Sequence, residues 1–382
     1  MIKKFTGKIS SFLVALESKV GLLAASFILA VLLLLLAMLY VQPDFSVNPK
    51  NHGYYFAQLS EHPFLFSENN PLQYRILAPF IGYITFLRGN LFFIVPLLFD
   101  VFLLAAVYYH YRKINYNVTD AFIMTAFMGL SGTVLISFVM PGYIDSITYL
   151  FLFLAFAEAT RVKRSAFFFG LALLNYETGL MLLPALYFYM WNMHKTQKLI
   201  GLKLFFIFFA ACLPYIVYRF FVSRHTDVVY SFPFYFSYEN IYGALVVTLS
   251  DFGMGAFYAF RLLWFFPLFG LYMLWRQKEK KLLYVVILIL VLTAAQLIIA
   301  LDTSRLFCLA FPAVLLSAEY LKKTWPADYF SNFSLRLLLF NFFILPYFVW
   351  DNTFMGMPSV FNNALRNIIF HLVDFLHHRF FS

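Results

Sequence analysis

The amino-acid sequence predicts an all-α polytopic membrane protein, a bundle of about 9 to 11 transmembrane helices. Of its 382 residues, 63% are hydrophobic and only 12% are charged, whereas soluble globular chains carry about a quarter charged residues. Apolar runs recur along the chain at about the 20 residues that a helix needs to cross a bilayer. Lys and Arg gather in short clusters between these runs, a pattern that orients membrane proteins.

The apolar runs divide the chain into candidate spans. They are the segments 20–41, 91–110, 120–139, 143–160, 199–221, 253–275, 282–301, 304–321 and 334–350. We expect residues 1–382 to form a single integral membrane domain. Its parts are the first span 20–41, an outer loop with an interfacial helix over 42–90, a helix bundle over 91–350, and an amphipathic C-terminal segment over 361–382.

The basic clusters set the expected orientation. Lys3, Lys4 and Lys8 place the N-terminus in the cytoplasm, because cytoplasmic loops are enriched in Lys and Arg. Residues 73–88 are apolar but contain Pro79, and a full crossing there would move every later basic cluster outside. We therefore expect 73–88 to form an interfacial or re-entrant helix.

Residues 165–193 need a separate explanation, since they are too long for one span and short for two. A bent or re-entrant hairpin that goes out and back keeps the following Lys195 and Lys198 in the cytoplasm. The bend then falls in the stretch NYETG, which brings Glu177 to the outer face. A carboxylate inside a membrane segment otherwise faces a protein interior or a wet cavity.

Polar side chains collect at the outer ends of the predicted spans. They are Asp44, Tyr54, Tyr55, Glu61, Tyr74 and Arg75 of the first loop, Asp145 after PGYI, Asn175 and Glu177 at the bend, and Asp302 and Arg305 in LDTSRLF. Arg261 would lie about two turns below this face in a regular helix. Several separate segments therefore deliver carboxylates and arginines to one side of the membrane.

Each of these residues also has a plain structural explanation. Asp44 and Glu61 could be solvated loop residues, and Asp145 could be an acid favoured at a helix N-terminus. Asp302 and Arg305 could be a local i,i+3 ion pair. Glu177 is harder to explain in this way, because Ser or Asn would serve at an ordinary loop tip.

The set of side chains suits group transfer from a lipid-anchored phosphate donor. The planar fork of Arg matches phosphate oxygens, and a carboxylate can accept the proton of a hydroxyl acceptor. Tyr54 and Tyr55 could stack on sugar faces. The expected partners are membrane lipids, a polyprenyl-phosphate sugar donor, and a glycan, lipid or protein acceptor.

Several motifs resemble the C-type (GT-C) multi-pass membrane glycosyltransferases of bacteria. They are the first outer loop PDFSVNPKNHGYYFAQL, its end NNPLQYRILAPFIGYI, and the span starts GYIDSITYLFLFLAF, NYETGLMLLPAL and SRLFCLAFPAVLL. The resemblance implies a catalytic base in the first loop, here Asp44 or Glu61, and lipid-phosphate contacts from Arg75 and Arg305. It also implies the bacterial inner membrane and a role in cell-surface glycan or glycolipid synthesis.

The first loop departs from the pattern of that family, because it has no paired acidic motif. Asp145 and Glu177 therefore stay alternative catalytic carboxylates. No motif calls for a divalent metal, so the cofactor is left open. The net charge of +10 does not indicate nucleic-acid binding, because the basic residues sit between membrane spans.

A transporter or lipid flippase is the main alternative. Asp100 and Arg261 lie inside apolar segments and 165–193 is bent, features that suit alternating access. The absence of a detectable internal repeat and the gathering of polar residues at one face argue against a transporter. A polymerase or an acyltransferase of surface glycans is a third possibility.

Overall fold

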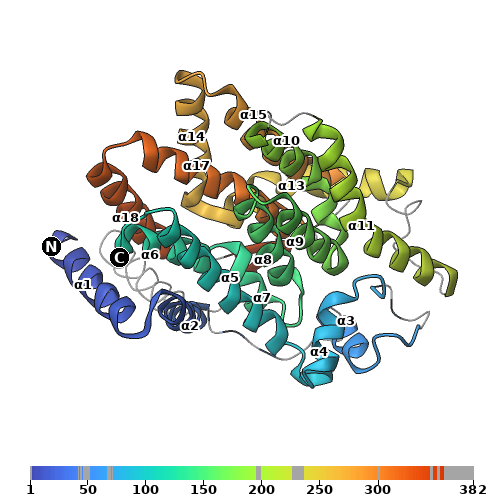
Figure 1. Ribbon diagram of the computed structural model, residues 1–382. Helices are drawn as coiled ribbons and strands as arrows, with labels where there is room; N and C mark the ends of the chain where they lie inside the picture. The colour runs from blue at the N-terminus through green and yellow to red at the C-terminus, as the bar shows by residue number, and fades with distance from the viewer. Residues whose placement is uncertain are drawn as a thin grey trace, which may run out of the picture.

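Helices build almost the whole of the computed structural model (Figure 1), as the sequence predicts. The structure describes residues 2–41, 43, 45, 52–66, 70, 72–194, 199–225, 236–298, 302–344, 347–350 and 353–356. Asp44 and the predicted amphipathic segment 361–382 lie outside these residues.

The prediction of a polytopic helical membrane protein is confirmed. Within the described residues, seven helical stretches are long and apolar enough to cross a membrane. They are Leu22–Val41, Gly89–Lys113, Val118–Val139, Ile200–His225, Phe252–Arg276, Lys280–Ile298 and Thr303–Thr324. A further apolar helix, Asp145–Ala157, is shorter and matches the predicted span 143–160.

The chain begins with two helices joined at a glycine. These are α1 (Ile2–Val20) and α2 (Leu22–Val41). Gly21 between them has a φ of +82°, a left-handed conformation that glycine adopts without steric strain. A bidentate ion pair from Arg112 to Glu17, with both contacts at 2.7 Å, joins the end of α1 to the later helix α5 (Ile94–Lys113).

The first loop folds into a small layer of its own. It contains α3 (His52–Glu61) and α4 (Leu77–Ile84), followed by the 3₁₀ turn η1 (Gly89–Leu91) and α5 (Ile94–Lys113). The eight residues of α4 span only about 12 Å, so this helix does not cross a bilayer. Phe56, Leu72 and Phe92 form the core of the layer, together with Ile147 of the later helix α8 (Asp145–Ala157).

A broken helix and a shorter one follow in the chain. They are α6 (Val118–Gly129) and α7 (Gly132–Val139), separated at Leu130 and Ser131, and then α8 (Asp145–Ala157). Asn117 caps α6 by accepting a hydrogen bond from the backbone N–H of Asp120. Almost every residue of α8 is buried, which places this helix inside the bundle.

Residues 165–193 go out and back as the sequence predicts. They form α9 (Val162–Asn175), the 3₁₀ turn η2 (Glu177–Leu182) and α10 (Leu183–His194). The end of α10 returns to the start of α9, because the His194 imidazole lies 3.2 Å from the carbonyl oxygen of Ala159. Glu177 therefore sits at the bend.

The second half of the chain completes the bundle. Its elements are α11 (Ile200–His225), α13 (Tyr238–Phe260), η3 (Arg261–Trp264), α14 (Phe265–Arg276), α15 (Lys280–Ala295), η4 (Gln296–Ile298), α16 (Thr303–Phe307), η5 (Cys308–Ala310), α17 (Phe311–Thr324) and α18 (Ala327–Phe343). Nine of the 14 residues of α17 are buried, so most of this helix lies in the interior of this half.

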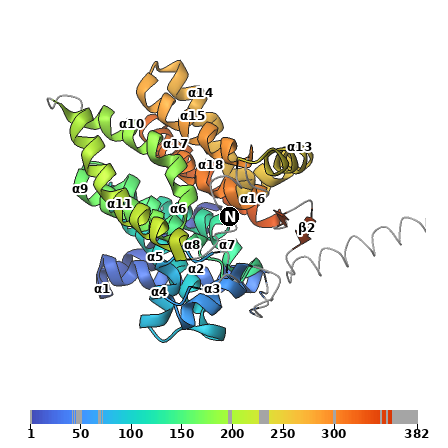
Figure 2. The same ribbon diagram turned by 90° about the vertical axis from the view of Figure 1, so that its right-hand side faces the viewer.

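The predicted span 334–350 differs from the structure. α18 ends at Phe343, and an antiparallel hairpin of β1 (Tyr347–Trp350) and β2 (Thr353–Gly356) follows. Pro346 lies between helix and hairpin in the sequence, and the residue before a proline is disfavoured in a helix. The run YFVW is also rich in residues that favour strands. The hairpin packs beside α13 and α16 (Figure 2).

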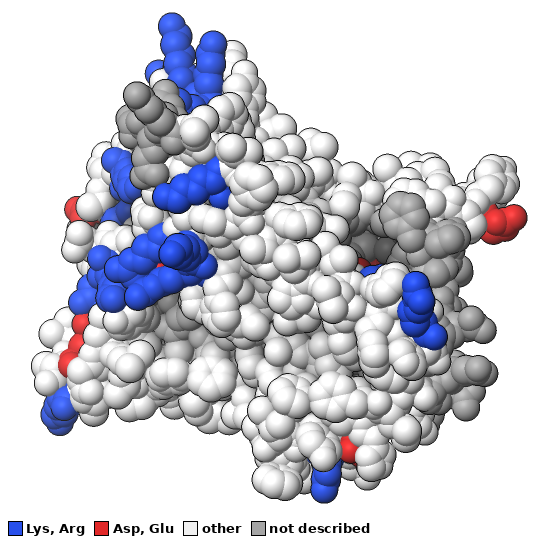
Figure 3. Space-filling view, turned by 45° about the vertical axis from the view of Figure 1, so that its right-hand side comes forward, with Lys and Arg blue, Asp and Glu red and all other residues white. Residues whose placement is uncertain are grey.

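The two ends of the bundle carry different side chains. α8 begins at Asp145 and ends shortly before Arg161, and α9 returns from Lys163 to Asn175. We call the end with Arg161 and Lys163 the basic end, and the end with Asp145 and Asn175 the site end. In the view of Figure 3, most of the visible Lys and Arg side chains gather on one side of the molecule.

Candidate functional site

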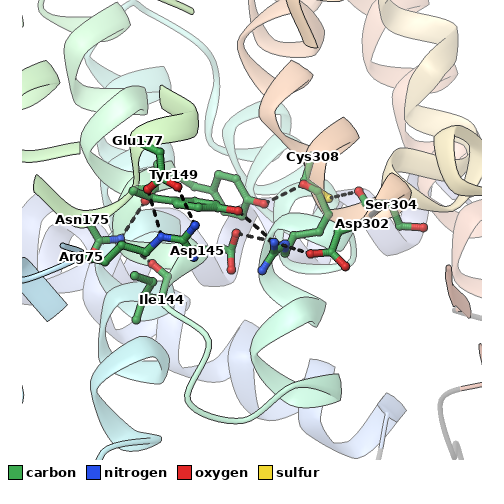
Figure 4. A network of polar contacts seen from close by, with 12 residues as sticks. Arg75, Ile144, Asp145, Tyr149, Asn175, Glu177, Asp302, Ser304 and Cys308 are labelled. Carbon is green, nitrogen blue, oxygen red and sulfur yellow. Dashed lines mark hydrogen bonds and ion pairs between the residues drawn. The ribbon is translucent and has the colours of Figure 1, made fainter. Parts of the chain in front are cut away.

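A buried ion pair joins the first loop to the bend between α9 and α10 (Figure 4). The Arg75 guanidinium donates from Nη2 to Glu177 Oε1 at 2.6 Å and from Nε to Oε2 at 3.0 Å. Tyr74 adds a hydroxyl that donates to Oε1 at 3.2 Å. The exposed fraction of the Arg75 side chain is 5% and that of Glu177 is 17%. This bidentate geometry is the strong form of a charge-assisted pair.

A second arginine, Arg305, lies on the other side of the same cluster. It pairs with Asp302 one turn earlier in the chain, and its Nε lies 3.9 Å from Asp145 Oδ1. The hydroxyl of Tyr149 donates to the Arg305 carbonyl oxygen at 3.1 Å. All three charged side chains are buried, so the local i,i+3 pair is part of a larger arrangement.

Tyr176 joins the two arginines. Its ring centroid is 4.0 Å from the guanidinium carbon of Arg75, and its hydroxyl accepts a hydrogen bond from Arg305 Nη2 at 2.9 Å. The backbone of Tyr176 is extended, with φ −156° and ψ 120°, because α9 ends at the preceding residue. This helix break therefore places the ring between two cations.

Asn175 holds the start of α8 next to this cluster. Its Nδ2 donates to the carbonyl oxygen of Ile144 and to Thr148 Oγ1, each at 2.7 Å. Asp145 lies between these two partners in the sequence, at the first position of α8. Asn175 is thus a positioning residue that fixes Asp145 relative to the bend.

The N-terminus of α3 covers the other side of Arg305. The His52 ring stacks on Tyr143 with centroids 5.6 Å apart and an 18° angle between planes. The Tyr143 ring in turn lies 5.2 Å from the Arg305 guanidinium. Burial, Arg305 and Arg75 together lower the pKa of His52 to about 3, so the imidazole is neutral at neutral pH.

Two glycines, Gly53 and Gly142, allow the first loop to pack closely against the segment before α8. Gly142 has a φ of +84°, and a Cβ there would lie 3.0 Å from the Cα of Gly53. Only glycine fits both the left-handed backbone and the contact. The first loop is therefore held against the segment that leads into Asp145.

Arg219 of α11 joins the cluster although the sequence did not single it out. Its guanidinium lies 4.3 Å from the ring centroid of Tyr74, and Nη1 donates to Tyr215 at 3.0 Å. The Tyr74 ring is thus flanked by Arg219 and Arg75, whose guanidinium carbon is 5.2 Å away. The available signal was a cation near the end of the apolar run 199–221.

Three other predicted site residues, Glu61, Tyr54 and Tyr55, belong to α3. Glu61 is exposed at the far end of α3 from His52, about 14 Å along the helix axis. Tyr54 and Tyr55 are half-buried and pack edge to face on each other. The described residues contain no group of three or more His, Cys, Asp or Glu arranged for a metal ion.

Arg261 also lies apart, with a structural role. It is 2% exposed. Among the described residues its acceptors are neutral, namely the Tyr40 hydroxyl and the carbonyl oxygens of Leu130, Asn341 and Ile344. These carbonyls lie at or next to the α6–α7 break and the end of α18. In lipid such freed backbone groups need a partner inside the protein, and Arg261 supplies it.

Stability should depend on pH through Glu177. Burial raises the pKa of this carboxyl, but Arg75 and Arg219 outweigh burial, so the pKa lies below its ordinary 4.5. A lowered pKa stabilises the fold above 4.5, and this contribution is lost as the pH falls through the lowered value. We expect Glu177→Gln to be less stable than the parent at neutral pH, with the difference shrinking in acid. Unfolding midpoints in detergent across this pH range measure both; a pH-independent difference would contradict the assignment.

Comparisons with protein-family models, curated proteins and solved structures found no match to this chain.

Proposed function

We propose that the protein is a membrane glycosyltransferase that takes a hexosyl or pentosyl group from a polyprenyl-phosphate donor. The observation that carries this proposal is the meeting of Arg75, Arg305 and Asp145 around Tyr176 at one end of the bundle. A site of this kind combines fixed positive charge for a lipid phosphate with a carboxylate close by. It needs no soluble nucleotide.

The arginines are the proposed phosphate ligands. Arg75 and Arg305 are held in place by carboxylates, so they need little reorganisation when an anion arrives. Arg219 is partly exposed and adds a third cation on the side of Tyr74. Because Glu177 accepts both hydrogen bonds of the Nε–Nη2 edge of Arg75, its proposed role is to orient that arginine.

Asp145 is the proposed general base. Its carboxylate lies 3.9 Å from Arg305, beyond hydrogen-bond distance, whereas Glu177 and Asp302 make close ion pairs. In the reaction, the acceptor oxygen forms a bond to the anomeric carbon of the sugar. The bond from that carbon to the phosphate oxygen breaks, polyprenyl phosphate leaves with the electron pair, and the acceptor proton passes to Asp145.

The distribution of charge supports an orientation for this reaction. With the basic end in the cytoplasm, the N-terminus is cytoplasmic and the site end faces the outside of the bacterial inner membrane. A lipid-linked donor and an acceptor of the cell surface are both available there. The product would then belong to a surface glycan or glycolipid.

The direct test is transfer by the purified protein in liposomes. The probes are polyprenyl phosphates that carry a labelled hexose or pentose, with and without a membrane extract as acceptor source. We expect acceptor-dependent loss of label from one donor. If every donor stays intact while the protein moves it across the bilayer, the glycosyltransferase proposal is overturned.

A transporter or lipid flippase is the alternative that this test separates. Asp100 favours it, because this residue is fully buried within α5 and has no ion-pair partner among the described residues. Buried carboxylates in membrane segments often serve as proton relays. The gathering of the other buried charges at one end of the bundle favours the enzyme, since transporters bind their substrates near the midplane.

A further inference from the structure

Two neighbouring cavities open at the basic end of the bundle. The first, of about 200 Å³, lies among α5, α8, α10 and α17, and the second, of about 260 Å³, lies among α10, α15 and α17. Tyr189, Met193, Leu316, Glu319 and Lys323 line both of them. The cavities therefore share one wall and form a divided recess between the helices.

The interior of this recess is apolar and its rim is basic. Phe153, Phe311 and Leu315 form the inner wall of the first cavity, and Val285 lies in the wall of the second. Lys281 and Lys323 stand exposed at the rim. A ligand that fits both parts has an anionic head and an apolar tail.

The shared wall also contains one acid, Glu319, which lies 3.3 Å from the His110 imidazole. Two lysines, Lys281 and Lys323, line the recess with it, so basic residues outnumber acidic ones there. Other Lys and Arg residues lie close in the sequence to residues that line the recess, Thr160 and Lys281. They include Arg161, Lys163 and Arg164 after Thr160, and Arg276, Lys278 and Lys280 before Lys281.

We infer that this recess binds an anionic phospholipid. Lys281 and Lys323 hold the phosphate, and the first part of an acyl chain enters the cavity between α10 and α17. The helix ends that carry these lysines, the start of α15 and the end of α17, are where a bilayer surface lies against a membrane bundle. Basic pockets between transmembrane helices bind lipid headgroups of this kind. The site is separate from the candidate active site and does not depend on the proposed function.

Lipid retention by the purified full-length protein tests the inference. The probes are phosphatidylglycerol and phosphatidylcholine, added in detergent and counted on the protein by native mass spectrometry. The parent protein should retain phosphatidylglycerol and not phosphatidylcholine. Lys281→Gln/Lys323→Gln should lower that retention about 25-fold, since each lysine near a membrane surface contributes about fivefold.

Two further variants make the outcome decisive. Lys113→Gln/Lys163→Gln removes the same charge from the same end but lines neither cavity, and it should keep the lipid. Met193→Trp fills the shared mouth without changing charge and should lose it. Equal loss in both lysine pairs, equal retention of the two lipids, or displacement of phosphatidylglycerol by inorganic phosphate would each overturn the inference. The last result would assign the rim to a soluble anion.

Discussion

Replacing Asp145 by Asn is expected to lower the rate of sugar transfer by about 10²- to 10⁴-fold, the usual contribution of a general base. Asn has the shape of Asp but cannot accept the acceptor proton. The fold should persist, because Arg305 keeps Asp302 as its ion-pair partner. The measurement is the initial rate of acceptor-dependent donor consumption in liposomes, at equal amounts of folded protein.

Glu61→Gln is the matched control for Asp145→Asn. Glu61 is a carboxylate of the first loop, where the family resemblance places the base, but it is exposed at the far end of α3. We expect this variant to transfer sugar at the parent rate. Full activity of Asp145→Asn together with inactivity of Glu61→Gln would move the base to the first loop and remove Asp145 from the mechanism.

Replacing Arg75 by Met should destabilise the fold by about 3–5 kcal/mol, the range measured when one partner of a buried ion pair is removed. The change leaves the largely buried Glu177 carboxylate without its bidentate donor. It also removes the cation packed on the Tyr176 ring. Reversible unfolding in mixed detergent micelles measures this difference in free energy.

Two further variants separate the effect of the unpaired Glu177 charge from the effect of the lost Arg75 packing contacts. Arg88→Met changes an exposed arginine that lies 5.6 Å from the Tyr83 ring, and it should cost well under about 1 kcal/mol. Arg75→Met/Glu177→Leu removes both charges and should recover part of the lost stability. If the double variant is no more stable than Arg75→Met, the unpaired Glu177 carboxylate is not the cause of the stability loss in Arg75→Met.

The spans were the most predictable part of this protein. Hydropathy alone places the first span at 20–41, and the helix runs over Leu22–Val41. The bend at NYETG followed from charge, since only an out-and-back path for 165–193 keeps the basic clusters on one side. Both predictions use properties summed over many residues, which is why they are robust to the details of packing.

Only the charged residues of the candidate site could be identified from the sequence. Arg75, Asp145, Glu177 and Arg305 stand out because an ion is rare in apolar sequence. Tyr176 does not stand out, since tyrosine is common at membrane interfaces and 26 tyrosines occur in the chain. Its position between two guanidinium groups depends on a helix break and on the long-range pairing of segments, which no local pattern encodes.

Tertiary contacts also determine the role of Arg261, which lies away from the site. A regular helix through 253–275 would place Arg261 about two turns below the site end, but the backbone turns at this residue, with a φ of +49°. A single Arg in an apolar run has the same sequence pattern whether its guanidinium binds a phosphate ligand or the carbonyl oxygens of the protein. The choice between these roles therefore needed the path of α6, α7 and α18.

The way Arg261 is held has an electrical consequence. Its positive charge is solvated by peptide carbonyls and one phenol, with no carboxylate opposite it among the described residues. A fixed cation inside a low-dielectric bundle raises the local electrostatic potential, because the surrounding medium screens it weakly. The side chain that binds the carbonyl oxygens at the helix breaks therefore also places a positive potential where α6, α7 and α18 meet.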